Sequence, residues 1–411
     1  MTRAVSSIYT CFLDAPPAAC VSIPFSESSP DPLAIRNPNT IPLVSSDHSG
    51  NSNNGGGGGG DQGDGGSGAG AAMTRSFLVT GTYTLDKDTS LRHGSLLLHE
   101  ALFSPVFNLN LHDTVPITSG SVLDIRLLSA SHIVVATSTG QIIVYSLNIS
   151  PNPTLHHIST HEITDPTTLL LNLSISPTNP LVLSATTNSS AIILFKFTDS
   201  SFTTVQIITR ILNSQNGLEA WISAFSLDGN TLYSGGDDAS FATWSASPIY
   251  TTESDTAFEM VLCSRNRRAH TAGVTAILPV TISEKEFILT GSYDQYIRIY
   301  SPLTRRFVGE MDLGGGVWRL EVISDHIHMS ALSQDEIAGT VWILASCMHA
   351  GCRVLKIDLM GEGEDVKITV VAGMEEHESM NYASAVVRSA DEVPVFVSTS
   401  FYDKRVCCWK V

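Results

Sequence analysis

The sequence predicts an all-β protein folded as a seven-bladed β-propeller, with a strand from the N-terminal segment closing the last blade. Two observations carry this prediction. Short stretches rich in β-branched and apolar residues recur at a nearly constant interval, and each is interrupted by a turn of small residues. Four-stranded units repeated at this spacing close radially into a ring, which leaves only short sheet edges.

The repeated unit is a strand, a small-residue turn and a second strand, and it occurs in six clear copies. The second strand of each copy ends near an aromatic or apolar anchor, and the anchors are 49 to 56 residues apart. They are Tyr145, Phe195, Trp244, Tyr300, Leu355 and Trp409. A looser copy at residues 77–101 precedes them. We interpret the seven copies as strands B and C of seven blades, counted outward from the axis.

A further apolar stretch precedes each copy and predicts the innermost strand, A, of its blade. These stretches are residues 19–25, 121–128, 169–176, 220–226, 273–279, 317–323 and 381–387. The last copy reaches Val411 without a fourth strand, so we expect residues 6–14 to supply it and close the ring. The predicted divisions are 1–25 for the closing strand and first strand of blade one, 26–72 for an insertion, and 73–411 for the propeller.

The insertion at 26–72 differs in composition from the rest of the chain. It is dominated by Ser, Asn, Pro and Gly, and such a segment cannot offset its ordering entropy by burial, so we expect it to be disordered. A docking or modification segment is the alternative. The insertion would form the A–B loop of blade one, on the face opposite the D–A and B–C loops.

Composition and charge exclude several functional classes. Hydrophobic residues make up 43% of the chain, charged residues 15%, and the formal net charge is −17. An acidic surface repels phosphate backbones and attracts basic protein partners, so we expect no nucleic-acid binding. The sequence shows no apolar run of about 20 residues, no signal peptide, and no disulfide framework among its seven cysteines. We expect a reduced, cytoplasmic monomer without a cofactor.

The chemically distinctive residues fall at D–A junctions and B–C turns of blades four to seven, which share one face. The junctions carry Glu219, Trp221, His270, Trp318, Arg319, His377 and Tyr382, and the turns carry Asp237, Asp294, His349, Tyr402 and Asp403. In many WD repeats a junction His and a turn Asp form a structural hydrogen-bond network. Asp294 with His270 fits this structural role, and the turn positions of Asp237 and Asp403 are equivalent.

His349 occupies the turn position where other blades carry Asp, and its ordinary pKa suits proton transfer near neutrality. It is either a site residue or a structural substitute for that Asp. Together with Cys347 and Cys352 it could hold zinc, but no fourth ligand is evident and small cysteines pack well inside blades. A Ser–His–Asp set such as Ser292, His349 and Asp403 is one of many such combinations, and spacing favours none. The sequence contains no nucleophile elbow, P-loop or dinucleotide fingerprint.

Several segments, taken in order, are similar to one known family. LEAWISAF, HTAGVTAI, GGGVWRL, LASCMHAGCRVL and STSFYDKRVCCW resemble the WD-repeat diphthine methylesterases of diphthamide biosynthesis over residues 77–411. The resemblance implies hydrolysis of the methyl ester of methylated diphthine on translation elongation factor 2. The products would be diphthine and methanol. It also implies a substrate that carries a trimethylammonium group, which aromatic faces and acids stabilise.

Under this resemblance we expect His349 to act as general base on a water molecule, oriented by Asp403 or Asp294. Arg319 or backbone N–H groups would stabilise the oxyanion. The expected substrate-binding residues are Glu219, Trp221, Asp237, His270, Trp318, His377, Tyr382 and Tyr402. Residues 382–386 depart from the family pattern, because the Asp and Trp usual there are missing. The alternative function is a non-catalytic WD-repeat scaffold for protein–protein interaction, since propellers host both roles.

Overall fold

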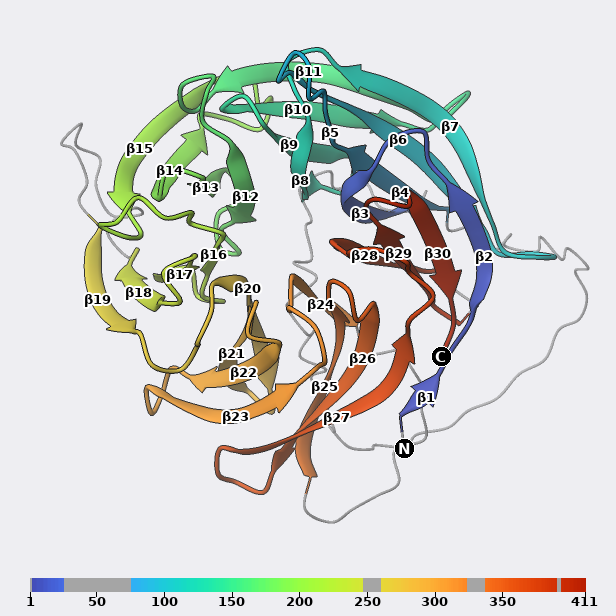
Figure 1. The fold of residues 1–411 in the computed structure, drawn as a ribbon. Helices are drawn as coiled ribbons and strands as arrows, with labels where there is room; N and C mark the ends of the chain where they lie inside the picture. Colours follow the sequence, from blue (N-terminus) through green and yellow to red (C-terminus); the bar gives the residue numbers. More distant parts are fainter. Residues whose placement is uncertain (1, 26–74, 247–259, 324–336, 390–392) are drawn as a thin grey trace, which may run out of the picture.

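The computed structural model describes residues 2–25, 75–246, 260–323, 337–389 and 393–411, and all of its regular secondary structure in these ranges is β-strand. Seven sheets stand around a common axis and form a closed ring (Figure 1). The predicted seven-bladed β-propeller is therefore confirmed. The predicted insertion at 26–72 lies outside the described residues. Within the same ranges, no helix has the length and apolar character needed to span a membrane.

Each blade contains four antiparallel strands, which we name A to D from the axis outward, in the order of blades one to seven. The A strands are β3 (Pro17–Phe25), β8 (Val122–Ser129), β12 (Leu170–Ile175), β16 (Ile222–Phe225), β20 (Val274–Ile282), β24 (Arg319–Ile323) and β28 (Ala383–Val387). The B strands are β4 (Arg75–Thr82), β9 (His132–Thr137), β13 (Val182–Thr187), β17 (Thr231–Gly235), β21 (Lys285–Ser292), β25 (Ile337–Ser346) and β29 (Val395–Ser400). The C strands are β6 (Arg92–Leu102), β10 (Gln141–Asn148), β14 (Ala191–Phe197), β18 (Phe241–Ser245), β22 (Tyr296–Ser301), β26 (Cys352–Met360) and β30 (Arg405–Trp409). The D strands are β7 (Asn108–Ile117), β11 (Thr154–Glu162), β15 (Val205–Leu212), β19 (Val261–Asn266), β23 (Arg306–Asp312), β27 (Asp365–Met374) and β2 (Ser7–Phe12). The short strand β5 (Thr84–Leu85) pairs with β6.

Ring closure follows the sequence prediction and adds one feature to it. Strand β2 pairs antiparallel with β30, from Ser7 opposite Trp409 to Phe12 opposite Arg405, so the predicted closing strand is confirmed. The residues before it form β1 (Arg3–Ala4), which pairs in parallel with β27 of blade six. Between them, the backbone N–H and the hydroxyl of Ser7 donate to the Glu376 carboxylate at 3.1 and 2.5 Å. The first residues of the chain therefore hold blades six and seven together.

The hydrophobic core consists of seven clusters, and each cluster fills the space between two neighbouring blades. Strand β30 shows how alternation builds two clusters at once. Val406 and Cys408 pack towards blade one, whereas Cys407 and Trp409 pack towards blade six. Successive strand side chains point to opposite sheet faces, so a strand packed on both faces is apolar throughout.

All six predicted anchors coincide with an irregularity in their blades. The pairing of strands C and D shifts register immediately before Tyr145, Phe195, Trp244, Tyr300, Leu355 and Trp409. An extra residue at such a bulge bends the strand and increases its right-handed twist. The repeated anchor therefore marks the point in each blade where the pairing of strands C and D becomes irregular and the outer strand bends.

Candidate functional site

Five aromatic side chains form a continuous surface on the face made by the D–A and B–C loops, which we call the D–A face. Trp221, Trp318 and Tyr382 directly precede the innermost strands β16, β24 and β28, whereas Tyr293 and Phe401 lie in B–C turns. Each of the five is partly exposed. We refer to these five residues as the aromatic arc.

The aromatic arc is connected by ring-to-ring contacts from blade four to blade seven. The ring centroids of Trp221 and Trp318 are 5.5 Å apart, those of Trp318 and Tyr382 are 5.0 Å apart, and those of Tyr382 and Phe401 are 5.4 Å apart. Tyr293 lies 6.1 Å from Trp221 and 5.8 Å from Trp318. These separations are typical of edge-to-face aromatic pairs. The arc therefore forms one surface rather than isolated rings.

Glycines in the loops allow this close approach. A Cβ atom at Gly316 would lie 2.6 Å from Sδ of Met348, and one at Gly273 would lie 2.9 Å from the Asp237 carboxylate and 3.1 Å from the Tyr293 ring. The first two distances are shorter than real Cβ atoms show, and the third is tighter than most real Cβ contacts. A larger residue at Gly273 would press on the Asp237 backbone and push the blade-four turn away from the junction, whereas at Gly316 the flexible Met348 side chain could move aside.

The blade-four end of the arc is acidic. The indole N–H of Trp221 donates to the exposed Asp237 carboxylate at 3.1 Å. The backbone N–H of Asp237 donates to the carbonyl of Glu219 at 2.9 Å, which brings the second acid to the same corner. Burial raises the pKa of Tyr293, and the charges of Asp237 and Glu219 add to this rise. This end of the arc suits a cation.

Next to the arc lies a guanidinium group without a carboxylate partner. The guanidinium carbon of Arg319 is 5.2 Å from the Trp318 ring centroid, and the group donates to the Trp318 carbonyl at 3.1 Å. Among the described residues Arg319 forms no ion pair, and burial lowers its pKa. A partly buried, unpaired guanidinium is a ready partner for a carbonyl oxygen, an oxyanion or a carboxylate.

Asp294 and His270, which we predicted as site residues, lie in a hydrogen-bond network inside blade five. The carboxylate of Asp294 is 2.8 Å from the guanidinium of Arg298 and accepts the backbone N–H of Thr271 at 3.0 Å. The His270 ring lies 3.0 Å from Thr290 Oγ1 and 3.0 Å from Arg298 Nη1. Burial alone would raise the pKa of Asp294, but its bonds to His270 and Thr271 and the Arg298 charge hold it well below the usual range.

Blade seven contains a similar network that includes His377 and Asp403. The His377 Nε2 atom is 2.8 Å from Ser398 Oγ, and the Trp409 indole donates to the same hydroxyl at 3.2 Å. Asp403 accepts the backbone N–H of Glu378 at 3.2 Å. Burial lowers the pKa of His377 to about 4, so the ring is neutral at pH 7. A third copy in blade four has Trp244 donating to Ser234 and Ser234 donating to Asn213. These residues hold junctions and turns together in three blades.

His349 lies at the tip of the B–C turn of blade six and is exposed. The turn is fixed by Met348, which has a positive φ of 46° and bridges to Asn381. Within the described ranges the His349 side chain forms no hydrogen bond or ion pair. Neither Asp403 nor Asp294 is within ion-pair distance of it, so the structure does not bring together the predicted base and its orienting acid.

The two cysteines near His349 are buried inside blade six, as expected for packing residues. Cys352 Sγ lies 3.1 Å from Asn381 Oδ1 and 3.0 Å from Ser384 Oγ. Burial raises the pKa of Cys352 to about 12 and that of Cys347 further. Both thiols are therefore protonated at neutral pH and unavailable as nucleophiles.

The remaining predicted residues have mixed positions. Trp221, Trp318 and Tyr382 lie in the arc, and Glu219, Asp237 and Arg319 lie beside it. Tyr402 is 71% exposed, with its ring 5.0 Å from that of Phe401 at the edge of the arc. Tyr293 and Phe401 were not predicted as site residues, although each precedes the turn acid of its blade. Tyr83 of blade one, 6.1 Å from Phe401, was not predicted either, although Asp86 and Asp88 stand in the same connection.

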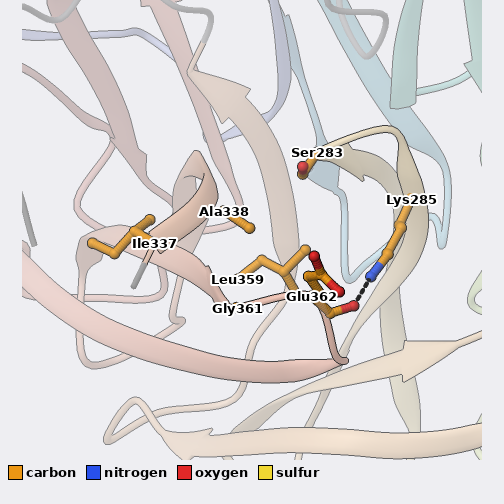
Figure 2. A pocket seen from close by; sticks show the side chains of 7 residues that line it. All are labelled: Ser283, Lys285, Ile337, Ala338, Leu359, Gly361 and Glu362. Atoms are coloured by element: carbon orange, nitrogen blue, oxygen red, sulfur yellow. Dashed lines mark hydrogen bonds between the residues drawn. The ribbon is translucent and has the colours of Figure 1, made fainter. Parts of the chain in front are cut away.

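The opposite face carries a cavity of about 490 Å³ between blades five and six. Lys285 at the start of β21 points across it and donates to the backbone carbonyl of Glu362 at 2.5 Å (Figure 2). A second backbone carbonyl, that of Gly363, accepts from the same ammonium group at 2.9 Å. The Lys285 ammonium group in this cavity is thus already hydrogen-bonded to two backbone carbonyls, and the cavity is remote from the arc.

Comparisons with known proteins agree with the fold and with the motifs. The family model described as "WD domain, G-beta repeat" matches residues 262–301, which include the blade-five network. The chain is 29% identical to "Diphthine methyltransferase" from Schizosaccharomyces pombe, covering 81% of this chain and 90% of that protein. It is 25% identical to the protein of the same name from Saccharomyces cerevisiae, covering 81% and 92%. A chain in the "Crystal Structure of Mitotic Checkpoint Complex" superposes with a TM-score of 0.53 at 16% identity, covering 82% of this chain and 86% of that one. This last similarity concerns the fold alone. The resemblance predicted from the motifs is confirmed.

Proposed function

We propose that this WD-repeat protein, similar over four fifths of its length to proteins named diphthine methyltransferase, acts in diphthamide biosynthesis. Its reaction would be hydrolysis of the methyl ester of methylated diphthine on translation elongation factor 2. One observation carries the site assignment. The aromatic arc has acids at one end and an unpaired guanidinium beside it, which matches a substrate carrying both a trimethylammonium group and an ester.

The trimethylammonium group would lie against Trp221 and Trp318, near Asp237. A quaternary ammonium ion has no hydrogen to donate, so its recognition depends on ring faces and on nearby negative charge. Each ring that faces such a cation contributes about 0.5–2 kcal/mol. The Trp221 indole is fixed by its 3.1 Å hydrogen bond to Asp237, so little side-chain entropy is lost on binding.

Arg319 would stabilise the oxyanion. Its guanidinium is held against the Trp318 ring and has only backbone carbonyl partners. Negative charge developing on the ester carbonyl oxygen would gain two N–H donors already in place, and such preorganised donors give large rate effects. Lysine would not reproduce this, because its ammonium lacks the planar fork.

Water is the proposed nucleophile, because the thiols next to the site are buried and protonated and the Ser398 hydroxyl is 0% exposed. The water needs a proton acceptor. The exposed imidazole of His349 could serve. The acidic chain, with a net charge of −17, would also attract a basic surface of the partner.

The test is to incubate the purified protein with elongation factor 2 carrying methylated diphthine and to follow loss of one methyl group by mass spectrometry. We expect complete demethylation by wild type and a strong loss with Arg319→Lys. Leu303→Ala, which changes a side chain that is 80% exposed and outside the site, serves as matched control. Binding of the partner without methyl loss by the folded protein would favour the non-catalytic scaffold.

A further inference from the structure

The B–C connection of blade one is the longest of the seven, and it lies on the D–A face. It spans residues 83–91, whereas the corresponding connections of the other six blades have three to five residues. Within it, strand β5 pairs with β6 so that Thr84 lies opposite His93 and Leu85 lies opposite Arg92. Blade one therefore continues into a small hairpin where the other blades have a short turn.

Hydrogen bonds within the chain hold this hairpin in place. The backbone N–H of Tyr83 donates to the carbonyl of Pro16 at 2.8 Å, and that of Asp86 donates to the carbonyl of Leu91 at 2.9 Å. The Asp86 carboxylate in turn accepts the backbone N–H of Asp88 at 2.9 Å. A segment that is already ordered loses little conformational entropy when a partner binds to it.

The two faces of the hairpin carry different residues. Residues directly opposite each other in an antiparallel pair share a face, and successive residues alternate between faces. Leu85 and Arg92 therefore share one face with Tyr83, whose hydroxyl accepts the Arg92 Nε–H at 2.9 Å. Leu91 lies on the other face, together with Asp86.

The face with Leu85 adjoins the blade-seven end of the aromatic arc. The ring centroid of Tyr83 is 6.1 Å from that of Phe401, which is 5.4 Å from Tyr382 in the arc and 5.0 Å from Tyr402. Leu85 is 42% exposed and Tyr402 is 71% exposed. We refer to the residues of this surface as the hairpin patch, and they are Tyr83, Leu85, Arg92, Phe401 and Tyr402.

The composition of the hairpin patch is that of a protein interface. Tyr and Arg are among the residue types most enriched at interface hot spots. Leu85 and Tyr402 belong to none of the seven core clusters. Among the described residues Arg92, which is half-buried, forms no ion pair, and its Nε–H donates to the Tyr83 hydroxyl. Exposed apolar area that is continuous with a binding site marks an interaction surface.

We propose that the hairpin patch docks elongation factor 2 through an apolar surface next to its methylated residue, with an oxygen acceptor of the factor opposite Arg92. This inference rests on the proposed function and deepens it. The substrate is a side chain of a folded protein, so the protein surface around that side chain must lie on the blades beside the arc. The arc binds the modified side chain, and the hairpin patch binds the protein that carries it.

The test compares steady-state demethylation of folded elongation factor 2 by wild type, Leu85→Ser and Arg92→Gln. Each substitution should raise KM about 5- to 30-fold, the loss typical of one hot-spot side chain. The value of kcat should stay within about two-fold of wild type, because the arc and Arg319 are unchanged. Leu91→Ser is the matched control, since Leu91 is 58% exposed on the other face of the same hairpin. It should keep both wild-type constants.

The outcomes separate docking from catalysis and from the proposed function. An unchanged KM for either variant would overturn the docking role. A fall in kcat at an unchanged unfolding midpoint would also overturn it, because the residue would then act in the reaction. Absence of demethylation by wild type would refute the proposed function alone. Calorimetric affinity for the factor then tests the patch: weaker binding by Leu85→Ser but not by Leu91→Ser supports docking, and equal binding by both overturns it.

Discussion

Ser398→Ala separates packing from catalysis in blade seven, where a Ser, a His and an Asp resemble a hydrolase triad in composition. The Ser398 hydroxyl is 0% exposed, lies 2.8 Å from His377 and accepts the Trp409 indole at 3.2 Å. Its removal leaves two buried ring nitrogens, Nε2 of His377 and Nε1 of Trp409, without their hydrogen-bond partner. Each such loss costs about 1–3 kcal/mol, so we expect the free energy of unfolding to fall by roughly 2–4 kcal/mol.

The assay is denaturant unfolding followed by tryptophan fluorescence, with demethylation measured on the folded variant. Ser398→Thr is the matched control, because blade five has Thr290 at the equivalent position, 3.0 Å from His270. It should cost less than about 1 kcal/mol. Turnover by folded Ser398→Ala should stay near that of wild type. A hundred-fold loss of turnover at unchanged stability would refute this reasoning and make Ser398 the nucleophile.

Three further predictions concern other parts of the ring. Burial raises the folded-state pKa of the Glu321 carboxyl to about 7 from an ordinary 4.5. The wild type should therefore lose roughly 3 kcal/mol of stability relative to Glu321→Gln as the pH rises from 4.5 through 7. A difference in denaturation midpoints that does not change with pH would contradict the burial of this carboxyl. Trp318→Leu should weaken binding of the trimethylated partner about 3- to 30-fold by calorimetry, and unchanged affinity would place the cation elsewhere. Glu376→Gln should speed amide hydrogen exchange in β2. The hydrogen bonds from Ser7 hold the pKa of Glu376 below its usual value, which means that they are stronger with the charged carboxylate than with a neutral side chain. Equal protection in both proteins would show that the carboxylate does not anchor the strand.

The repeat pattern was sufficient to predict the ring, because each blade needs the same two apolar strands around a small turn. It also predicted the role of β2, since the last copy reaches Val411 without a fourth strand. It could not predict β1, because two residues paired in parallel at a sheet edge have no periodic signal. Parallel pairing of such a short segment depends on the position of β27, which only the complete fold determines.

The site was predicted by position better than by chemistry. Trp221, Trp318 and Tyr382 stand at D–A junctions, so the blade pattern alone brings them to one face. Residue type could not separate Asp237 beside the arc from Asp294, because the difference lies in Arg298, whose guanidinium reaches the Asp294 carboxylate at 2.8 Å.

The pairing of β2 with β30 has a consequence for biosynthesis. Thr10 and Cys407, neighbours across this pair, are 397 positions apart in the chain. Strand β2 is synthesised long before β30, so blades one to six can assemble while the ring stays open. Contacts of such high sequence separation form slowly, and the unpaired edge can meet other chains in the meantime. Closure of the ring therefore depends on a slowly formed contact, and a chaperone that shields the open edge would raise the yield of folded protein.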